Sequence, residues 1–68
     1  MKQISGKAFC KILEAHGWTL RRVSGSHHIY IKTGYKERIV VPVHANKPLK
    51  IGLLKAQMKL AGIHEREL

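Results

Sequence analysis

The sequence predicts a single α+β domain, residues 1–68, in which two helices cover one face of a three-stranded antiparallel sheet. Three observations lead to this prediction. Apolar residues recur at steps of three and four near both ends of the chain. In the middle, three short stretches are rich in β-branched and aromatic residues. Short turns separate these stretches, so the expected order is α-β-β-β-α, with the second face of the sheet open to solvent.

The first helix is expected at residues 6–16. Ser5 precedes it as a good N-cap residue, and apolar residues between positions 8 and 13 form one face. Gly17 is expected to end the helix in the left-handed conformation. Trp18 should then fold back as the apolar residue beyond the cap.

The three strands are expected at residues 19–24, 28–32 and 38–42. Gly25 and Ser26 form the bend between the first two. Residues 33–36 supply the turn between the second and the third.

The second helix is expected after the loop 43–47. Pro48 is expected near its N-terminus, where the missing N–H costs nothing. An apolar stripe runs through residues 51–61, and Gly62 followed by Ile63 repeats the ending of the first helix.

The chain is strongly basic. It carries 13 lysine and arginine residues against four acids, which gives a formal net charge of +9 and a pI of about 10.2. A folded basic domain favours a polyanionic partner, and nucleic acid is the default. The alternative is that the charge only keeps a small protein soluble. No helix combines a basic face with an aromatic apolar face, which argues against a membrane partner.

Cys10 is the only cysteine, so no disulfide can form within the chain. A single cysteine fits a reducing compartment, and its place in a helical pattern predicts a small buried side chain. The chain shows no signal-peptide pattern and no apolar run long enough to span a bilayer. A cytoplasmic location is therefore expected.

Two adjacent histidines, His27 and His28, follow the Gly25-Ser26 bend. Successive side chains of a strand point to opposite faces, so one of the two must lie on the outer face or at its rim. An exposed imidazole in a positive field suggests acid–base chemistry on an anion. From the residues alone, a structural histidine at the start of a strand remains the alternative.

The five histidines raise the question of a metal site. His27 and His28 diverge in a strand, no helix carries a His-x3-His pair, and no acidic residue is spaced to help. We expect no metal ion and no cofactor.

Five short motifs occur in one order along the chain. They are Gly17-Trp18, Gly25-Ser26-His27-His28, Val41-Pro42-Val43-His44, Leu49-Lys50-Ile51-Gly52-Leu53-Leu54 and Ala61-Gly62-Ile63. Each is common by itself. Together, on a basic chain of this length, they resemble the HicA-type (YcfA-like) mRNA interferase toxins from the first helix to Ile63.

This resemblance implies a fold like the double-stranded RNA-binding domain and endoribonuclease activity on mRNA, which the absence of a metal-ligand pattern makes metal-independent. It implies that His27, in the Gly-(Ser/Gly/Asn)-His motif, is the catalytic residue, and that His28 occupies a variable position. It also implies a type II toxin–antitoxin system, with a HicB-type antitoxin that masks the active site. Ile51-Gly52-Leu53 departs from the Gly-Thr-Leu step common in the family, which leaves a capping hydroxyl unaccounted for.

Cations and the backbone near the bend are expected to hold RNA. The bend allows close approach of the RNA backbone and offers N–H groups to a phosphate. The candidate RNA-binding residues are Arg21, Arg22, Gly25, Ser26, His28, Lys32, Lys36 and Lys47.

His44 is the candidate second proton carrier, because the loop after Pro42 can return it toward His27. The alternative is that His44 only hydrogen-bonds the loop. Tyr30 and Tyr35 are candidates for stacking on bases, with packing or plain surface exposure as the alternative.

Two other functions fit the same charge and fold. A non-catalytic module, similar to double-stranded-RNA-binding domains, would grip RNA by shape and by phosphate and 2′-hydroxyl contacts, and needs no histidine at the bend. A basic protein that only pairs with an acidic partner would show no direct affinity for RNA, even at low salt.

Overall fold

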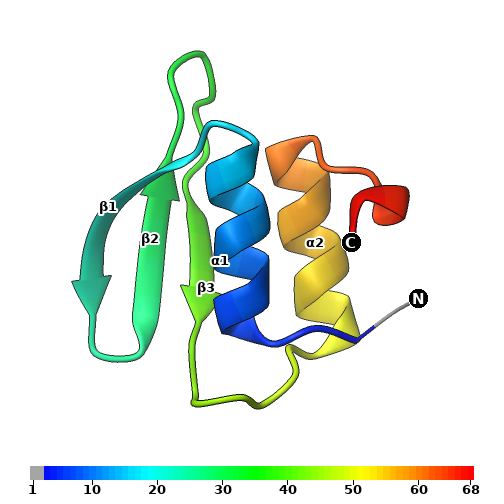
Figure 1. The fold of residues 1–68 in the computed structure, drawn as a ribbon. Coiled ribbons are helices and arrows are strands. Elements are labelled where there is room, and N and C mark those ends of the chain that lie inside the picture. Colours follow the sequence, from blue (N-terminus) through cyan, green and yellow to red (C-terminus); the bar gives the residue numbers. More distant parts are fainter. Residues whose placement is uncertain (1–2) are drawn as a thin grey trace.

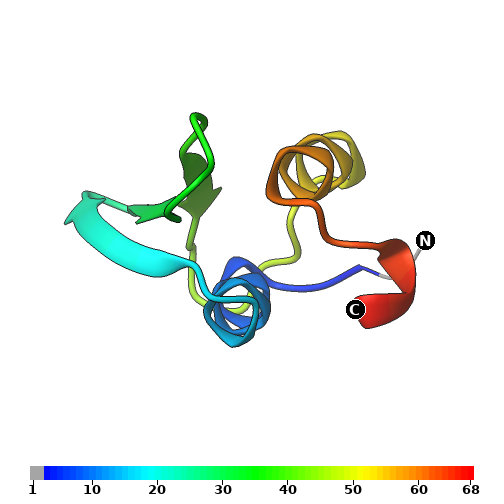
Figure 2. The same ribbon diagram turned by 90° about the horizontal axis from the view of Figure 1, so that it is seen from above.

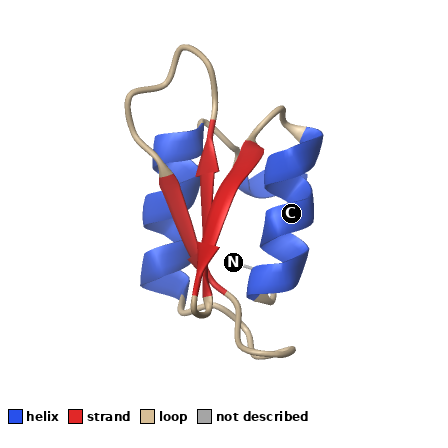
Figure 3. Cartoon of the chain, turned by 90° about the vertical axis from the view of Figure 1, so that its left-hand side faces the viewer, coloured by secondary structure: helices blue, strands red, loops and turns tan. Residues whose placement is uncertain are grey.

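The structure is a computed structural model that describes residues 3–68, and it confirms the α-β-β-β-α order (Figure 1). The elements are α1 (Gly6–Ala15), β1 (Thr19–Ser24), β2 (His27–Ile31), β3 (Ile39–Pro42), α2 (Ile51–Ala61) and a short 3-10 helix, η1 (Glu65–Glu67). Both helices lie on one face of the sheet, and the other face is free of helices (Figures 2 and 3).

Helix α1 is capped at both ends as the sequence predicts. The Ser5 side chain accepts a hydrogen bond of 3.1 Å from the Ala8 N–H. At the other end Gly17 has φ +90°, and the N–H of Trp18 donates to the Leu13 carbonyl at 3.0 Å. Trp18 is only 2% exposed, so the cap also fixes an apolar side chain in the core.

The sheet is an antiparallel meander in the order β1-β2-β3. Ser24 pairs with His27, which leaves Gly25 and Ser26 as a two-residue turn. Gly25 has φ +60°, and Ser26 is not among the residues of positive φ, a combination that fits a type II′ turn. This turn places His27 directly at the start of β2.

Helix α2 begins at Ile51, so the prediction that Pro48 lies in its first turn is wrong. Pro48 forms an isolated antiparallel bridge with Ser5, and the Leu49 N–H donates to the Ile4 carbonyl at 2.8 Å. These contacts hold the segment extended until Lys50, the N-cap residue. The predicted ending is confirmed, because Gly62 has φ +70°.

One hydrophobic core lies between the helices and the inner face of the sheet. Helix α1 lies against β1 and β3, and α2 lies against β3. The largest fully buried side chains are Tyr30, Phe9, Leu13, Ile39, Leu54 and Val41. Cys10 is buried with them, as predicted, and burial raises the pKa of its thiol. Within residues 3–68, none of the helices combines the length and the apolar character needed to cross a bilayer.

Strand β1 is a free edge of the sheet (Figure 1). All six of its residues are exposed, and the helices leave Leu20 and Val23 uncovered. Exposed edge strands offer unpaired backbone groups to other chains. Arg21 and Arg22 lie in the middle of this edge.

At Gly6 the backbone of α1 lies close to the backbone at the end of β3. A Cβ built at Gly6 would fall on the carbonyl oxygen of Pro42. We expect Gly6→Ala to lower the free energy of unfolding by about 1–3 kcal/mol, because two backbones would have to separate. Urea unfolding measures the change. Gly52→Ala is the control, because its Cβ would meet open space, and it should stabilise the protein by roughly 0.5–1 kcal/mol. Equal stability of Gly6→Ala and wild type would contradict this packing.

Tyr30 joins the sheet to α1. Its ring is 1% exposed, and its hydroxyl donates to Glu14 Oε2 at 2.6 Å. Its ring packs in the core, so the packing alternative holds and Tyr30 is not a surface for bases. Burial, and secondly this hydrogen bond, raise the pKa of Tyr30 above its ordinary value.

A raised pKa means that the fold favours the neutral phenol. The neutral phenol of Tyr30 therefore makes its whole contribution to the free energy of unfolding below about pH 10, the ordinary pKa of tyrosine. This contribution is lost as the pH rises further. We expect Tyr30→Phe to cost about 1 kcal/mol at pH 7 and to flatten the loss of stability above pH 10. Urea unfolding at pH 7 and pH 11 checks this result. Tyr35→Phe, at an exposed ring, should keep the alkaline loss. If Tyr30→Phe lost as much stability above pH 10 as wild type does, Tyr30 would not be the cause of that loss.

Candidate nucleic-acid interface

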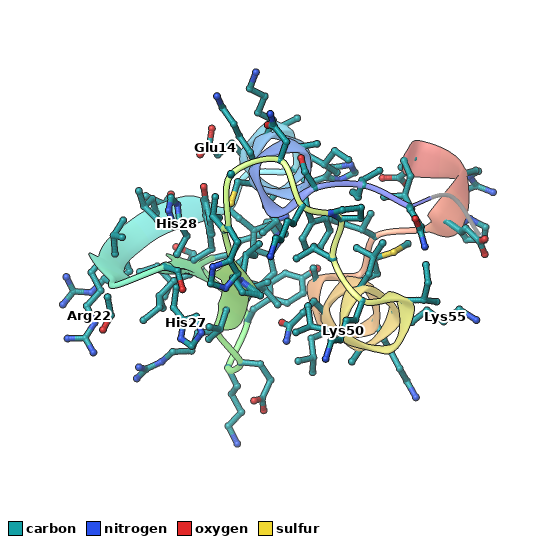
Figure 4. The ribbon with its side chains drawn as sticks, turned by 90° about the horizontal axis from the view of Figure 1, so that it is seen from below. Glu14, Arg22, His27, His28, Lys50 and Lys55 are labelled. Atoms are coloured by element: carbon teal, nitrogen blue, oxygen red, sulfur yellow. The ribbon has the colours of Figure 1, made fainter. Side chains whose placement is uncertain are left out.

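The two adjacent histidines lie on opposite faces of the sheet, as strand alternation predicts. His27 pairs with Pro42, and His28 pairs with Val41, a core residue with no exposed surface. Figure 4 shows His28 on the side of the sheet where Glu14 lies, and His27 on the other side with Arg22. His27 is exposed and His28 is partly buried. His27 is therefore the histidine that faces solvent on the open face.

Three neighbouring segments hold His27 in place. The turn at Gly25 and Ser26 sets it opposite Ser24 of β1. On its other side, pairing with β3 continues past His27, because the Val43 N–H donates to the Ser26 carbonyl at 2.8 Å. His27 is thus an exposed side chain on backbone that is hydrogen-bonded on both sides.

An open hollow of about 400 Å³ lies on this same face. We call it the arginine groove; it is lined by Arg21, Arg22, Ile29, Ile31 and Arg38. Its floor is apolar, and its walls carry three guanidinium groups. Arginine binds phosphate through bidentate hydrogen bonds, so this groove is suited to a polyanion.

A β-bulge brings both predicted arginines to the groove. The register passes from Leu20 opposite Tyr30 to Arg22 opposite Ile29, which leaves Arg21 without a partner. Strict alternation would have sent one arginine to each face. The bulge re-aims a side chain, and both arginines line the same hollow.

The sequence reasoning missed Arg38. It stands two positions before Val40, and Val40 pairs with Ile29 on the open face. Alternation from the predicted third strand carries this signal, but only once the strand register is known.

A second hollow, of about 330 Å³, lies where the loop after β3 meets the start of α2. We call it the proline hollow; it is lined by Pro42, His44, Lys47, Pro48, Leu49, Lys50 and Leu53. The structure places two predicted residues here, His44 and Lys47. It adds Lys50, which is not among the residues that the sequence predicts to bind RNA.

His27 lies between the two hollows. Ile31, Ile29 and His27 are alternate residues of β2 on the open face, so His27 follows the groove floor along the strand. Its cross-strand partner Pro42 lines the proline hollow. The arginines, His27 and Pro42 therefore follow one another on the open face, and the lysines near α2 lie beyond the edge strand β3.

Two of the predicted cations lie elsewhere. Lys32 donates from Nζ to the His16 carbonyl at 2.7 Å and lies over the Tyr35 ring, with Nζ 5.3 Å from the centroid. It therefore caps α1. Lys36 lies in the connection between β2 and β3, at the opposite end of the sheet from the Gly25 turn (Figure 1). Tyr35 packs against Trp18, with ring centroids 5.0 Å apart.

Among residues 3–68, no three histidine, cysteine, aspartate or glutamate side chains are grouped closely enough to hold a metal ion. The residues that line the two hollows supply imidazole, guanidinium and ammonium groups.

A family model described as the HicA toxin of bacterial toxin–antitoxin systems matches residues 6–63 of the 68-residue chain. The chain belongs to the HicA toxin family. The match extends from the first residue of α1 to the apolar residue after α2, so it includes His27, both hollows and the core. A member of this family is the toxin of a toxin–antitoxin pair, which implies an antitoxin as its partner. A comparison with curated proteins gives no match.

Proposed function

We propose that this HicA toxin is an endoribonuclease that cleaves mRNA without a metal ion, with His27 as its general acid or base. The observation that carries the proposal is the place of His27. It is exposed on the open face between a groove with three arginines and a hollow with two lysines. An RNA strand on this path would bring a phosphodiester next to an imidazole.

The reaction uses the 2′-hydroxyl of the substrate as nucleophile. This oxygen attacks the adjacent phosphorus, the bond from phosphorus to the 5′-oxygen breaks, and a 2′,3′-cyclic phosphate forms. One group must take the 2′ proton, another must supply a proton to the leaving 5′-oxygen, and cations must stabilise the crowded phosphate. His27 can take either proton role because the ordinary pKa of imidazole is near neutrality.

His44 is the proposed second proton carrier. Antiparallel partners such as His27 and Pro42 have Cα atoms about 4.5–5.5 Å apart, and two further residues span at most about 7 Å. The Cα atoms of the two histidines therefore lie within about 12.5 Å, and one phosphodiester between the side chains would be in reach of both. The alternative is a role for His44 in the loop alone.

The remaining proposed RNA contacts follow the same path. Arg21 and Arg22 would bind phosphates in the arginine groove, and Lys47 would bind one at the proline hollow. Gly25 and Ser26 would allow close approach of the backbone at the turn. Lys32, Lys36 and His28 remain predictions from the sequence, away from the path that the two hollows define.

The proposed protein partner is a HicB-type antitoxin with an acidic surface that covers the open face. Opposite charges of this size should make association fast and sensitive to salt. The proposed location is the cytoplasm, where mRNA is found.

Two other functions share the same surface. A non-catalytic RNA-binding module would use both hollows but leave RNA intact, and a protein that only binds an acidic partner would not bind RNA at all. The exposed histidine between two basic hollows favours the enzyme, because neither of the other functions needs it.

The test is cleavage of a long mRNA by purified protein in the presence of EDTA. We expect activity to persist, since no step uses a metal ion, and the new ends to be 2′,3′-cyclic phosphate and 5′-hydroxyl. Mass spectrometry of the short products identifies the ends. Activity that returns only with a divalent ion, or 3′-hydroxyl ends, would overturn the mechanism.

A further inference from the structure

The proline hollow combines two kinds of surface. Pro42, Pro48, Leu49 and Leu53 supply apolar walls, and Leu49 is only 5% exposed. Lys47 and Lys50, both exposed, supply positive charge, and His44 supplies an imidazole. The ligand that fits such a site has a flat apolar part and an attached anion.

We propose that the proline hollow holds one nucleobase of the RNA, next to the bond that is cut, and so sets the base preference of the toxin. This inference rests on the proposed function. The apolar walls would cover the face of the base, and the lysines would bind the phosphates on either side of it.

The size and charge of the hollow favour a single nucleotide unit. Its volume of about 330 Å³ is at the lower end for ligand pockets, about 300–1,000 Å³, which suits one nucleotide unit better than a whole helix or a long peptide. Two lysines in the lining disfavour a metal cation. A purely aliphatic ligand would make no use of the two ammonium groups.

The position of the hollow relates it to the reaction. Pro42 in its wall is the cross-strand partner of His27, and such partners have Cα atoms about 4.5–5.5 Å apart. The rest of the lining comes from the loop after β3 and from the start of α2, which packs against β3. A base in the hollow would therefore belong to a nucleotide close to the reacting phosphate.

The hollow is formed before any ligand binds. Two of its walls are prolines, whose φ angles are fixed. The Lys47 N–H donates to the His44 carbonyl at 3.0 Å, closing a turn in which Ala45 has the unusual φ of +51°. The bridge of Pro48 with Ser5 anchors the far wall to the N-terminal segment. A preformed site loses little conformational entropy on binding, which favours discrimination between bases.

The test uses His27→Ala protein, which cannot consume the RNA, and a fluorescent RNA of about ten nucleotides. A series of such RNAs carries one abasic ribonucleotide at successive positions, and anisotropy gives each Kd. We expect the affinity to fall on the order of tenfold when the abasic unit is at the one position whose base would enter the hollow. At all other positions the loss should be much smaller. We call this difference the register effect. The double variant Leu53→Ala, His27→Ala should bind the intact RNA more weakly than His27→Ala does. Its affinity should no longer depend on the position of the abasic unit.

Leu60→Ala is the matched control, because Leu60 is a 40% exposed leucine of the same helix outside the hollow. It should keep the register effect. The abasic series itself needs no change in the hollow, so the test stands even where Leu53→Ala fails to fold.

The outcomes separate this inference from the proposed function. Cleavage by wild type together with equal loss at every abasic position overturns the hollow as a base site and leaves the endoribonuclease intact. A register effect in a protein that never cleaves RNA supports the hollow as a base site, but it refutes the enzyme and with it the place of this base next to a cut bond. No binding of any RNA refutes both, and leaves an acidic side chain of the antitoxin as the occupant.

Discussion

His27→Ala is expected to lower the rate of RNA cleavage by about 10²–10⁴-fold, the usual contribution of a positioned acid or base. The loss should fall on the chemical step, because alanine removes the imidazole and leaves the arginine groove and the backbone intact. A gel assay with long mRNA and EDTA measures the rate, and anisotropy measures RNA binding. We expect binding within a few-fold of wild type.

His28→Ala is the matched control, since it removes the same group from the next residue. His28 lies on the inner face opposite Val41, so this change should leave most of the cleavage activity. Equal rates for wild type and His27→Ala would move the catalytic role to His44 or reveal a contaminating nuclease. If both folded variants lost cleavage, the loss could not be assigned to the imidazole on the open face, because His28 lies on the other face.

The combined variant Arg21→Ala, Arg22→Ala and Arg38→Ala is expected to weaken RNA binding on the order of a hundredfold at low salt. Each arginine that neutralises a phosphate releases counterions on binding, about 0.7 per contact for a single strand. The slope of log K against log salt should therefore fall by about 2. Titrations at several salt concentrations give both quantities.

A second triple variant separates local contacts from net charge. Lys11→Ala, Lys55→Ala and Lys59→Ala also lowers the formal charge from +9 to +6, because three cations are lost. These exposed lysines lie outside both hollows, and Lys55 points away from His27 (Figure 4). We expect little change in the slope. Identical losses in the two variants would contradict the arginine groove as the binding site.

Most of the fold could be predicted because its signals are local. Ser5, Gly17 and Gly62 each mark a helix end through the conformation of one or two residues, and the structure confirms all three. The start of α2 could not be predicted in this way. Pro48 is a good first-turn residue in isolation, but its bridge with Ser5 joins segments more than 40 positions apart. A contact of that kind leaves no local signature.

In the candidate site too, local features could be predicted and those that depend on distant contacts could not. The alternation rule correctly separated His27 from His28, since it concerns neighbouring residues of one strand. The bulge at Arg21 and the inclusion of Arg38 depend on how β1, β2 and β3 pair, which the sequence alone does not reveal. The positive charge of Lys32 alone makes it a candidate for RNA binding. Two positions after the buried Tyr30, it lies on the helix side and caps α1.

We also expect the arginines of β1 to oppose self-association of the protein. The unpaired edge strand with its exposed Leu20 and Val23 could pair with a strand of another molecule. If that molecule were a second copy, its Arg21 and Arg22 would lie against Arg21 and Arg22 of the first. Repulsion between like charges then keeps the molecules apart, and salt weakens it. If the proposed RNA contacts hold, we expect colloidal stability and RNA affinity to depend on the same guanidinium groups. A variant that releases RNA will also be more prone to self-association, and concentrated salt will not protect it.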